Sequence, residues 1–406
     1  MTDLNWILSS DFLDMRFYDL PNLLICLLFV FTICRLMKVP RLVEIVLVGH
    51  CLLPMLLNGV LFPFSYMPDA FKYWRAFNAI RSGELDFFEA LAAGNVEQAA
   101  AFFALMPFPL AVTPLSLGFI NTFLYLALFF WLYRKGIFTN VSIWFYLLYP
   151  SLALYTGMGL RDTFILVFMV VAVQWAREGR WFILWGSLGL LFIIKFQNFF
   201  ILAPLLFTYT LFGIRYTGVS LRKGFLTLSA GIAAFFAAAP VALPLVNYFR
   251  AAMFREDGGD SGQLVLIDGP SEFLSEGITS GLYFLMKPFP WEAASALQLI
   301  QSIENIVVAI FLILITRVAW RRAPRKLVFW LLFMIFALSI YGLVVFNYGT
   351  AARYRYPFLV IFVLFVCADC HVRSLFKPLA PALWRSLHVG QVQSPPDAIC
   401  SFKEGN

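Results

Sequence analysis

Charged and amide side chains stand at the ends of several long apolar segments of this sequence. Arg161 and Asp162 lie together between two such segments, and Lys195 lies close to Gln197 and Asn198 between the next two. An ion inside a bilayer costs about 3 kcal/mol or more, so charges at such places mark candidate functional sites. Arginine and lysine groups that meet there would bind a large phosphorylated anion.

Three further segments carry polar residues on the same predicted side of a membrane. They are Met67-Pro-Asp-Ala-Phe-Lys-Tyr-Trp-Arg75, Lys287-Pro-Phe-Pro-Trp-Glu292 and Asn347-Tyr-Gly-Thr-Ala-Ala-Arg-Tyr-Arg-Tyr-Pro357. The third combines two arginines with a Gly-containing turn directly after an apolar segment. We therefore expect five segment ends to contribute polar groups to one cavity.

The chemistry that suits these residue types is glycosyl transfer from a lipid-linked diphosphate. Arginine and lysine bind diphosphate oxygens and neutralise the charge that grows as a glycosyl–phosphate bond breaks. A carboxylate, Asp69 or Glu292, would take the proton of the acceptor hydroxyl, and Arg161 would assist the reaction as a catalytic cation. The residues assigned to diphosphate binding are Arg353, Arg355, Lys195, Lys287 and Asn347, and those assigned to sugar binding are Tyr73, Trp291 and Tyr354.

Each candidate also has a simpler explanation. A single arginine at a helix end commonly anchors the helix in the headgroup region. Arg161 and Asp162 can form a local ion pair, and Asp69 follows Pro68, where it would cap a helix over 70–81. Tyrosine and tryptophan also form ordinary aromatic belts at membrane interfaces.

The composition identifies the elements that must position these residues as membrane helices. The chain has 406 residues, of which 61% are hydrophobic and 13% charged, against about 25% charged in a soluble domain. A soluble domain, a disordered chain, a disulfide scaffold and a coiled coil are excluded. We predict an all-α bundle of about eleven spans, near 20–37, 42–62, 110–133, 139–158, 162–176, 181–196, 198–214, 225–247, 296–316, 327–346 and 356–370.

The distribution of basic residues predicts the direction of insertion. Most of the 30 lysines and arginines fall on one face of the predicted bundle, which identifies that face as cytoplasmic. The net charge of +7 thus reflects topology and not nucleic-acid binding. The N-terminus is predicted outside, with long extracytoplasmic loops at 63–109 and 247–295. Residues 1–370 form a single transmembrane domain in this scheme, and 371–406 form a cytoplasmic tail.

No metal site, cofactor or disulfide is expected from the sequence. None of the six cysteines falls in a predicted outer loop, so no disulfide is expected. Cys367-Ala-Asp-Cys370-His371 has the spacing of a haem attachment motif, but c-type haem is attached outside and this motif is predicted at the cytoplasmic end. No His, Cys and carboxylate set has zinc-ligand spacing.

The span count and the motifs quoted above resemble bacterial polysaccharide repeat-unit polymerases of the Wzy and EpsG type. The motifs are Asp69-x-x-x-Tyr73, Arg161-Asp162, Lys287-Pro-Phe-Pro-Trp-Glu292 and Asn347-x-Gly-Thr-x-x-Arg353-x-Arg355-x-Pro357. More distantly, the chain resembles the GT-C class of polyprenyl-phosphate-dependent glycosyltransferases. The first large outer loop lacks the paired carboxylates of an idealised GT-C pattern.

The resemblance implies a multi-pass enzyme of the bacterial inner membrane. Such an enzyme moves a growing glycan from undecaprenyl diphosphate onto a newly delivered lipid-linked repeat unit. Arg161, Lys195, Arg353 and Arg355 would hold the diphosphate, and Asp69 or Glu292 would be the base. The implied partners are the lipid-linked oligosaccharide, membrane lipid and a chain-length regulator protein, with no nucleic acid. The alternatives are a GT-C transferase that uses a polyprenyl-phosphate sugar, and a flippase for lipid-linked glycans.

Overall fold

The computed structural model describes residues 16–58, 60–62, 68–109, 111–256 and 264–375, and this part of the chain is helical without strands. The predicted all-α class is therefore confirmed. Six of the described helices are long and apolar enough to cross a membrane, which indicates a multi-pass membrane protein. They are α3 (Leu20–Met37), α8 (Leu115–Arg134), α12 (Trp181–Leu211), α16 (Ala296–Arg322), α17 (Pro324–Val344) and α18 (Tyr348–Asp369).

The other described helices are, with one exception of 36 residues, at most 17 residues long. Within the predicted spans these are α4 (Arg41–Leu57), α9 (Asn140–Leu148), α10 (Pro150–Gly157), α11 (Asp162–Glu178) and α14 (Leu221–Glu256). Outside the predicted spans these are α5 (Asp69–Ser82), α6 (Phe87–Ala92), α7 (Asn95–Ala104), α13 (Ile214–Thr217), α15 (Pro270–Met286) and the 3-10 helix η3 (Pro290–Glu292). Beyond residue 375 the predicted tail lies outside the described residues.

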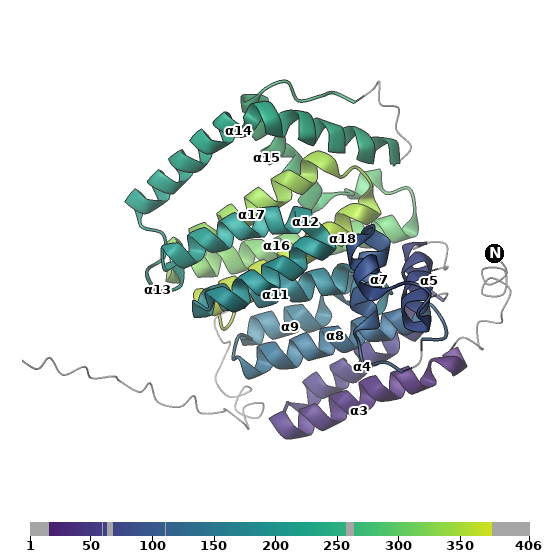
Figure 1. The fold of residues 1–406 in the computed structure, drawn as a ribbon. Helices are drawn as coiled ribbons and strands as arrows, with labels where there is room; N and C mark the ends of the chain where they lie inside the picture. The colour runs from purple at the N-terminus through teal and green to yellow at the C-terminus, as the bar shows by residue number, and fades with distance from the viewer. Residues whose placement is uncertain (1–15, 59, 63–67, 110, 257–263, 376–406) are drawn as a thin grey trace, which may run out of the picture.

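The helices α8 and α18 lie at the centre of the bundle. In their most apolar segments, 78% and 83% of the residues are buried, whereas the value for both α3 and α16 is 28%. In Figure 1 the row of helices runs from α3 and α4 on one side, past α8 and α11, to α17, with α14 and α15 beyond. Groups presented by α18 are therefore surrounded by the rest of the protein.

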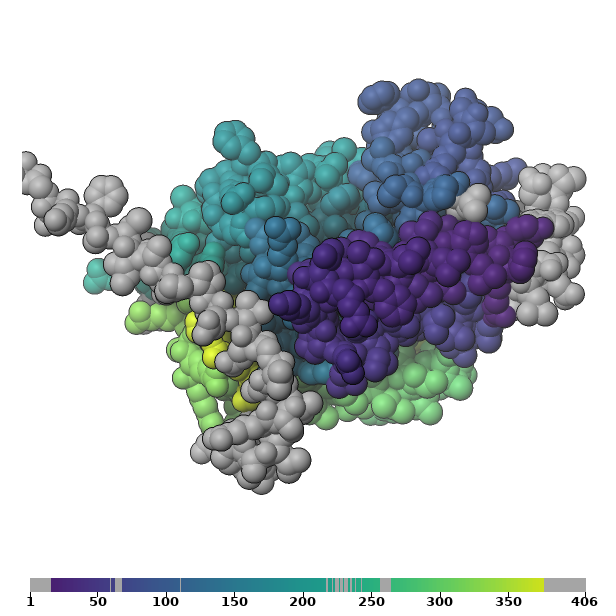
Figure 2. All heavy atoms as spheres, turned by 90° about the horizontal axis from the view of Figure 1, so that it is seen from below, coloured from purple at the N-terminus to yellow at the C-terminus, as the bar shows by residue number. Residues whose placement is uncertain are grey.

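Helices α5, α6 and α7 form a lobe across one end of the bundle, which we call the capped end. In Figure 1 α5 and α7 stand across the direction of the long helices, and in Figure 2 the blue residues of this lobe project from the body of the molecule. Asp86 caps α6 by accepting from the backbone N–H groups of Phe88 and Glu89. Phe103 of α7 packs edge-to-face on Phe164 of α11, with ring centroids 5.0 Å apart.

Helix α12 reverses its direction at Lys195. This residue has non-helical backbone angles (φ −159°, ψ 81°). The rings of Trp181 and Phe207 lie 6.2 Å apart, although 26 residues of straight helix would separate them by about 39 Å. The two halves of α12 therefore form an antiparallel pair whose tip, at Lys195, lies where the sequence predicts a break between two spans.

Helix α14 is bent in Figure 1, and Pro240 and Pro244 lie within it. Proline removes a backbone donor and bends a helix, which explains this shape. Its last residues, together with α15, occupy the loop predicted for 247–295.

Helices α15 and α17 cross at a contact made by glycines. A Cβ atom on Gly281 would lie 2.9 Å from the backbone nitrogen of Ser339, and one on Gly342 would lie 2.7 Å from the nitrogen of Gly281 and would also meet the carbonyl group of Ser280. Such distances leave no room for a methyl group, so the two backbones are in direct contact.

Replacing Gly342 with alanine is therefore expected to lower stability by about 1–3 kcal/mol, because the added methyl must push two helix backbones apart. Thermal unfolding of the purified protein in detergent would measure this effect. Gly189→Ala is the matched control, because a Cβ there meets nothing within 4 Å. Equal melting temperatures for the two variants would contradict the tight crossing.

A closed polar network joins four helices at the other end of α11. Asp369 of α18 accepts from Arg177 of α11 at 3.0 and 2.7 Å, from the Tyr209 hydroxyl at 2.9 Å and from the Trp330 indole at 3.1 Å. Arg177 and Asp369 are buried. Because the carboxylate is both paired and hydrogen-bonded, the network ties α11, α12, α17 and α18 together at this end.

Candidate active site

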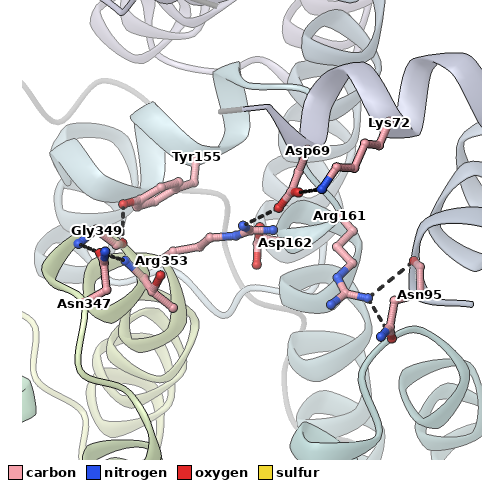
Figure 3. Close-up of polar contacts among 10 residues, drawn as sticks. Asp69, Lys72, Asn95, Tyr155, Arg161, Asp162, Asn347, Gly349 and Arg353 are labelled. Carbon is pink, nitrogen blue, oxygen red and sulfur yellow. Dashed lines mark hydrogen bonds and ion pairs between the residues drawn. The ribbon is translucent and has the colours of Figure 1, made fainter. Parts of the chain in front are cut away.

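Arg353 lies between two aspartates at the capped end. Its Nε donates to Oδ2 of Asp162, and its Nη1 lies 3.5 Å from Oδ2 of Asp69. Figure 3 shows the guanidinium reaching from α18 toward α11 and α5. The two aspartates lie 191 and 284 positions from Arg353 in the chain, so these ion pairs form only in the folded bundle.

Asp69 is the exposed member of this group and does not cap α5. Its helix begins with Pro68 at the N-cap and has no side-chain cap hydrogen bond. The carboxylate instead contacts Arg353 on one side and Lys72 on the other, the latter at 3.3 Å. The Asp69 side chain is 39% exposed, whereas that of Asp162 is 3% exposed. Asp69 is thus the carboxylate of the two that is accessible from outside the protein.

Arg161 joins the lobe to the tip of α12. Its Nη1 donates to Oδ1 of Asn95 at 3.1 Å and to the carbonyl of Ile194 at 3.3 Å. That carbonyl directly precedes the reversal at Lys195, where regular helical hydrogen bonding is interrupted. Arg161 therefore lies at the meeting point of α7, α11 and α12, as Figure 3 shows for its contact with Asn95.

Lys195 and Tyr354 are in direct contact. The ammonium lies 3.8 Å from the centre of the Tyr354 ring, and Lys195 is buried. The Tyr354 ring also packs against Tyr341, with centroids 5.2 Å apart, and Tyr341 donates its hydroxyl to Asn198. Lys195 and Arg353 thus lie near the same ring, since the Arg353 guanidinium is 6.0 Å from the centre of Tyr354.

Tyr73 lies beneath the charged groups and not on the surface. It is 3% exposed, so its ring offers no face to a sugar, and we leave it out of the sugar-binding set. Burial raises the pKa of its hydroxyl, while Arg161 and Arg353 act in the opposite direction. Tyr73 also lies one helical turn after Asp69, on the same face of α5.

Arg355 has a structural position. It is 1% exposed, and its Nη1 donates to the carbonyls of Phe284, Leu285 and Lys287 at 3.0, 3.0 and 2.9 Å. Its Nη2 donates to Asn305 of α16. These bonds satisfy carbonyls at the C-terminal end of α15. Arg355 therefore binds the protein's own backbone in this structure and is not a member of the candidate site.

Lys287 and Glu292 belong to a second group of residues, away from the contacts of Arg353. Lys287 is buried and donates to the carbonyl of Val345. Glu292 accepts from the Tyr283 hydroxyl at 3.1 Å and from the backbone N–H of Phe289 at 2.9 Å. Burial raises the pKa of Tyr283, which keeps its proton available for this bond.

Asn347 and Trp291 complete the account of the predicted site residues. Asn347 is the N-cap of α18, where its Oδ1 accepts from the N–H groups of Gly349 at 2.8 Å and Thr350 at 3.2 Å. Such a bond is the usual role of asparagine at this position of a helix. Trp291 is 79% exposed and stacks on Phe289 with ring centres 4.8 Å apart. These contacts place Asn347 at the start of α18 and Trp291 in the segment that follows α15.

The structure thus brings six of the predicted residues together. With Asp162 and Lys72, these six form a group that we call the Arg353 cluster. The six are Asp69, Tyr73, Arg161, Lys195, Arg353 and Tyr354. Two residues of this region were not among the predicted site residues. Asp162 could have been found from its position next to Arg161, whereas no pattern in the sequence indicates Asn95. Two carboxylates and four cations give the cluster an excess of positive charge, which suits an anionic substrate.

Removing Arg355 is expected to weaken folding and not binding. In Arg355→Met, three carbonyls and Asn305 lose a buried charged donor, which we expect to cost about 2–4 kcal/mol. Protein yield in the membrane and the melting temperature in detergent would both fall. Lys72→Met serves as the comparison, because the Lys72 side chain is 60% exposed and its contact with Asp69 lies at the surface. A normal melting temperature for Arg355→Met would contradict the structural role.

No family model, curated protein or solved structure matches the chain.

Proposed function

We propose that this protein is a membrane glycosyltransferase that polymerises oligosaccharide repeat units carried on undecaprenyl diphosphate. The observation that supports this most is the Arg353 cluster, where a half-exposed carboxylate lies beside several cations at one end of a helical bundle. The proposal includes a bacterial inner membrane, about eleven spans, the capped end outside, and a chain-length regulator as partner. The reversal of α12 at Lys195 is consistent with counting its halves as two spans.

In the proposed reaction, a hydroxyl of the acceptor sugar attacks the anomeric carbon of the growing chain. The bond from that carbon to the phosphate oxygen breaks, and undecaprenyl diphosphate leaves with the electron pair. Asp69 takes the hydroxyl proton, while Arg353, Arg161 and Lys195 stabilise the charge on the leaving diphosphate. Lys72, 60% exposed beside Asp69, lies where it can meet the phosphates of an arriving lipid.

Two other functions use the same cluster differently. A GT-C transferase would take one sugar from a polyprenyl monophosphate, and its activity would be expected to depend on donor type and divalent cations. A flippase would need charged groups along a path through the bundle. The buried Arg177–Asp369 pair lies at the opposite end, but all the donors and acceptors of that network described above bind one another. We therefore rank polymerisation first.

The glycan chain-length profile of cells tests the proposal. Cells that lack the protein would be complemented with wild type, Arg353→Gln or Glu84→Gln, an exposed control in the lobe. We expect Arg353→Gln cells to lose long chains and accumulate single lipid-linked repeats on the outer leaflet, compared with wild type at an equal amount of protein in the membrane. Accumulation on the inner leaflet would indicate a flippase, and an unchanged profile would make the cluster a structural anchor.

A further inference from the structure

We propose that Asp162 is the positioning residue of the Arg353 cluster, and that Asp69 gives up its contact with Arg353 when a substrate phosphate binds. This inference rests on the proposed function, since it assigns a phosphate to the site. It goes further by giving the two aspartates different tasks. It also states an order of events: phosphate binding frees the base.

The contact between Asp162 and Arg353 has the features of a fixed pair. The Asp162 carboxylate is 3% exposed and lies in the first turn of α11, where the positive end of the helix dipole stabilises its charge. It accepts from Nε, so the guanidinium is held by its inner edge. Breaking a buried ion pair is costly, so an arriving anion will not displace Asp162.

The contact between Asp69 and Arg353 is the weaker of the two. The distance from Nη1 to Oδ2 is 3.5 Å, and the Asp69 side chain is 39% exposed. This distance is at the outer limit of a hydrogen bond. Exposed ion pairs of this kind contribute only about 0.2–1 kcal/mol to the stability of a protein. A phosphate oxygen carries at least comparable charge and can form a better-aligned bond with the same nitrogen.

Asp69 therefore occupies the place that a phosphate oxygen would take. When a phosphate takes that place, the carboxylate loses its nearest guanidinium and keeps Lys72, 3.3 Å from its other oxygen. The carboxylate oxygen that faced Arg353 is then free to accept a hydrogen bond from an acceptor hydroxyl. Binding of the donor thus prepares Asp69 to accept the proton of the second substrate.

The first test measures the Kd for undecaprenyl diphosphate of the full-length protein in nanodiscs. If Asp69 competes with phosphate for Arg353, Asp69→Asn will lower the Kd about two- to fivefold. Glu84→Gln removes one exposed carboxylate of the same lobe without touching Arg353 and controls for the general change in charge. An unchanged or higher Kd for Asp69→Asn, or an equal decrease for Glu84→Gln, would overturn the exchange.

The second test compares Asp162→Asn, Arg353→Gln and the double variant. If Asp162 acts through Arg353, each single change will raise the Kd about tenfold or more, and the double variant will be no worse than Arg353→Gln. Effects that multiply in the double variant would show that Asp162 acts independently, which overturns its positioning role. If Asp162→Asn does not fold, the Asp69 measurement still decides whether the exchange occurs.

Failure of the proposed function gives a different result. In that case wild-type protein does not bind undecaprenyl diphosphate, and the same variants are measured with undecaprenyl monophosphate. The same order of Kd values with the monophosphate would support the assignment of the two aspartates. A different order would overturn it.

Discussion

Replacing Asp69 with asparagine is expected to slow glycan polymerisation by about 10²–10⁴-fold, the range typical for loss of a general base. Asparagine keeps the size of the side chain and one carbonyl oxygen, but it does not accept a proton at neutral pH. The protein should fold normally, because the Asp69 carboxylate makes no cap hydrogen bond in α5. The rate of chain extension in membranes supplied with lipid-linked repeats would measure the effect.

A matched variant separates loss of the base from loss of an ion pair. Lys72→Gln removes the other partner of Asp69 but leaves the carboxylate in place. Because this pair is exposed, we expect a change of less than about tenfold. Equal losses in Asp69→Asn and Lys72→Gln would mean that the ion pair matters and that the base lies elsewhere, with Glu292 the next residue to test.

The largest effect on stability is expected from Asp369→Ala, at about 3–5 kcal/mol. The change leaves Arg177 buried without its carboxylate and removes the acceptor of Tyr209 and Trp330. Four helices would lose their common contact. In mixtures of a mild detergent and sodium dodecyl sulfate, the midpoint of unfolding should therefore move to a clearly lower fraction of sodium dodecyl sulfate. Helix content followed by circular dichroism would give the transition.

An exposed carboxylate, Glu84 in the lobe, provides the comparison for this prediction. Replacing an exposed surface side chain should change stability by about 0.5 kcal/mol or less, so Glu84→Ala is expected to have little effect. If Asp369→Ala were no more destabilising than Glu84→Ala, the Arg177 network would not hold the helices together.

The sequence predicted the helices well where an apolar segment ends at a clear break. The gap that the sequence predicts at residue 197 lies two residues from the reversal of α12 at Lys195. The segment 139–158 is predicted as one span, but the structure divides it into α9 and α10 before Pro150, as the restriction on residues preceding proline explains. The number of spans and the direction of insertion stay predictions. Helices α4 and α11 have 17 residues each, and hydropathy alone does not separate a short span from a buried helix of that length.

The site was predicted less completely, and α18 shows why. The last span was expected to begin at residue 356, which made Asn347 to Arg355 a polar turn whose two arginines share one site. The helix begins at Tyr348, so Arg353 and Arg355 lie two positions apart in it and point in different directions. Arg353 meets Asp162, whereas Arg355 meets the end of α15.

Asp69 shows a limit of a different kind. Its position after Pro68 fits both a helix cap and a reactive carboxylate, since both need an oxygen near the first turn. What separates them is the side chain's partner, Arg353, which is 284 positions away in the chain. No local pattern contains that contact, because it depends on how α5 lies across the bundle.

The fold-back of α12 also has a consequence for the surrounding bilayer. Its halves are residues 181–194 and 196–211, and they measure about 21 and about 24 Å, against about 30 Å for a typical hydrocarbon core. If each half crosses the membrane, as the proposed eleven spans require, lipids next to these short helices would have to compress to match them, and the aqueous boundary would move inward on that side of the protein. Lys195 and Arg161 lie at the tip of the pair, so the headgroup of the proposed polyprenyl carrier would then lie at the same depth in the membrane as these cations.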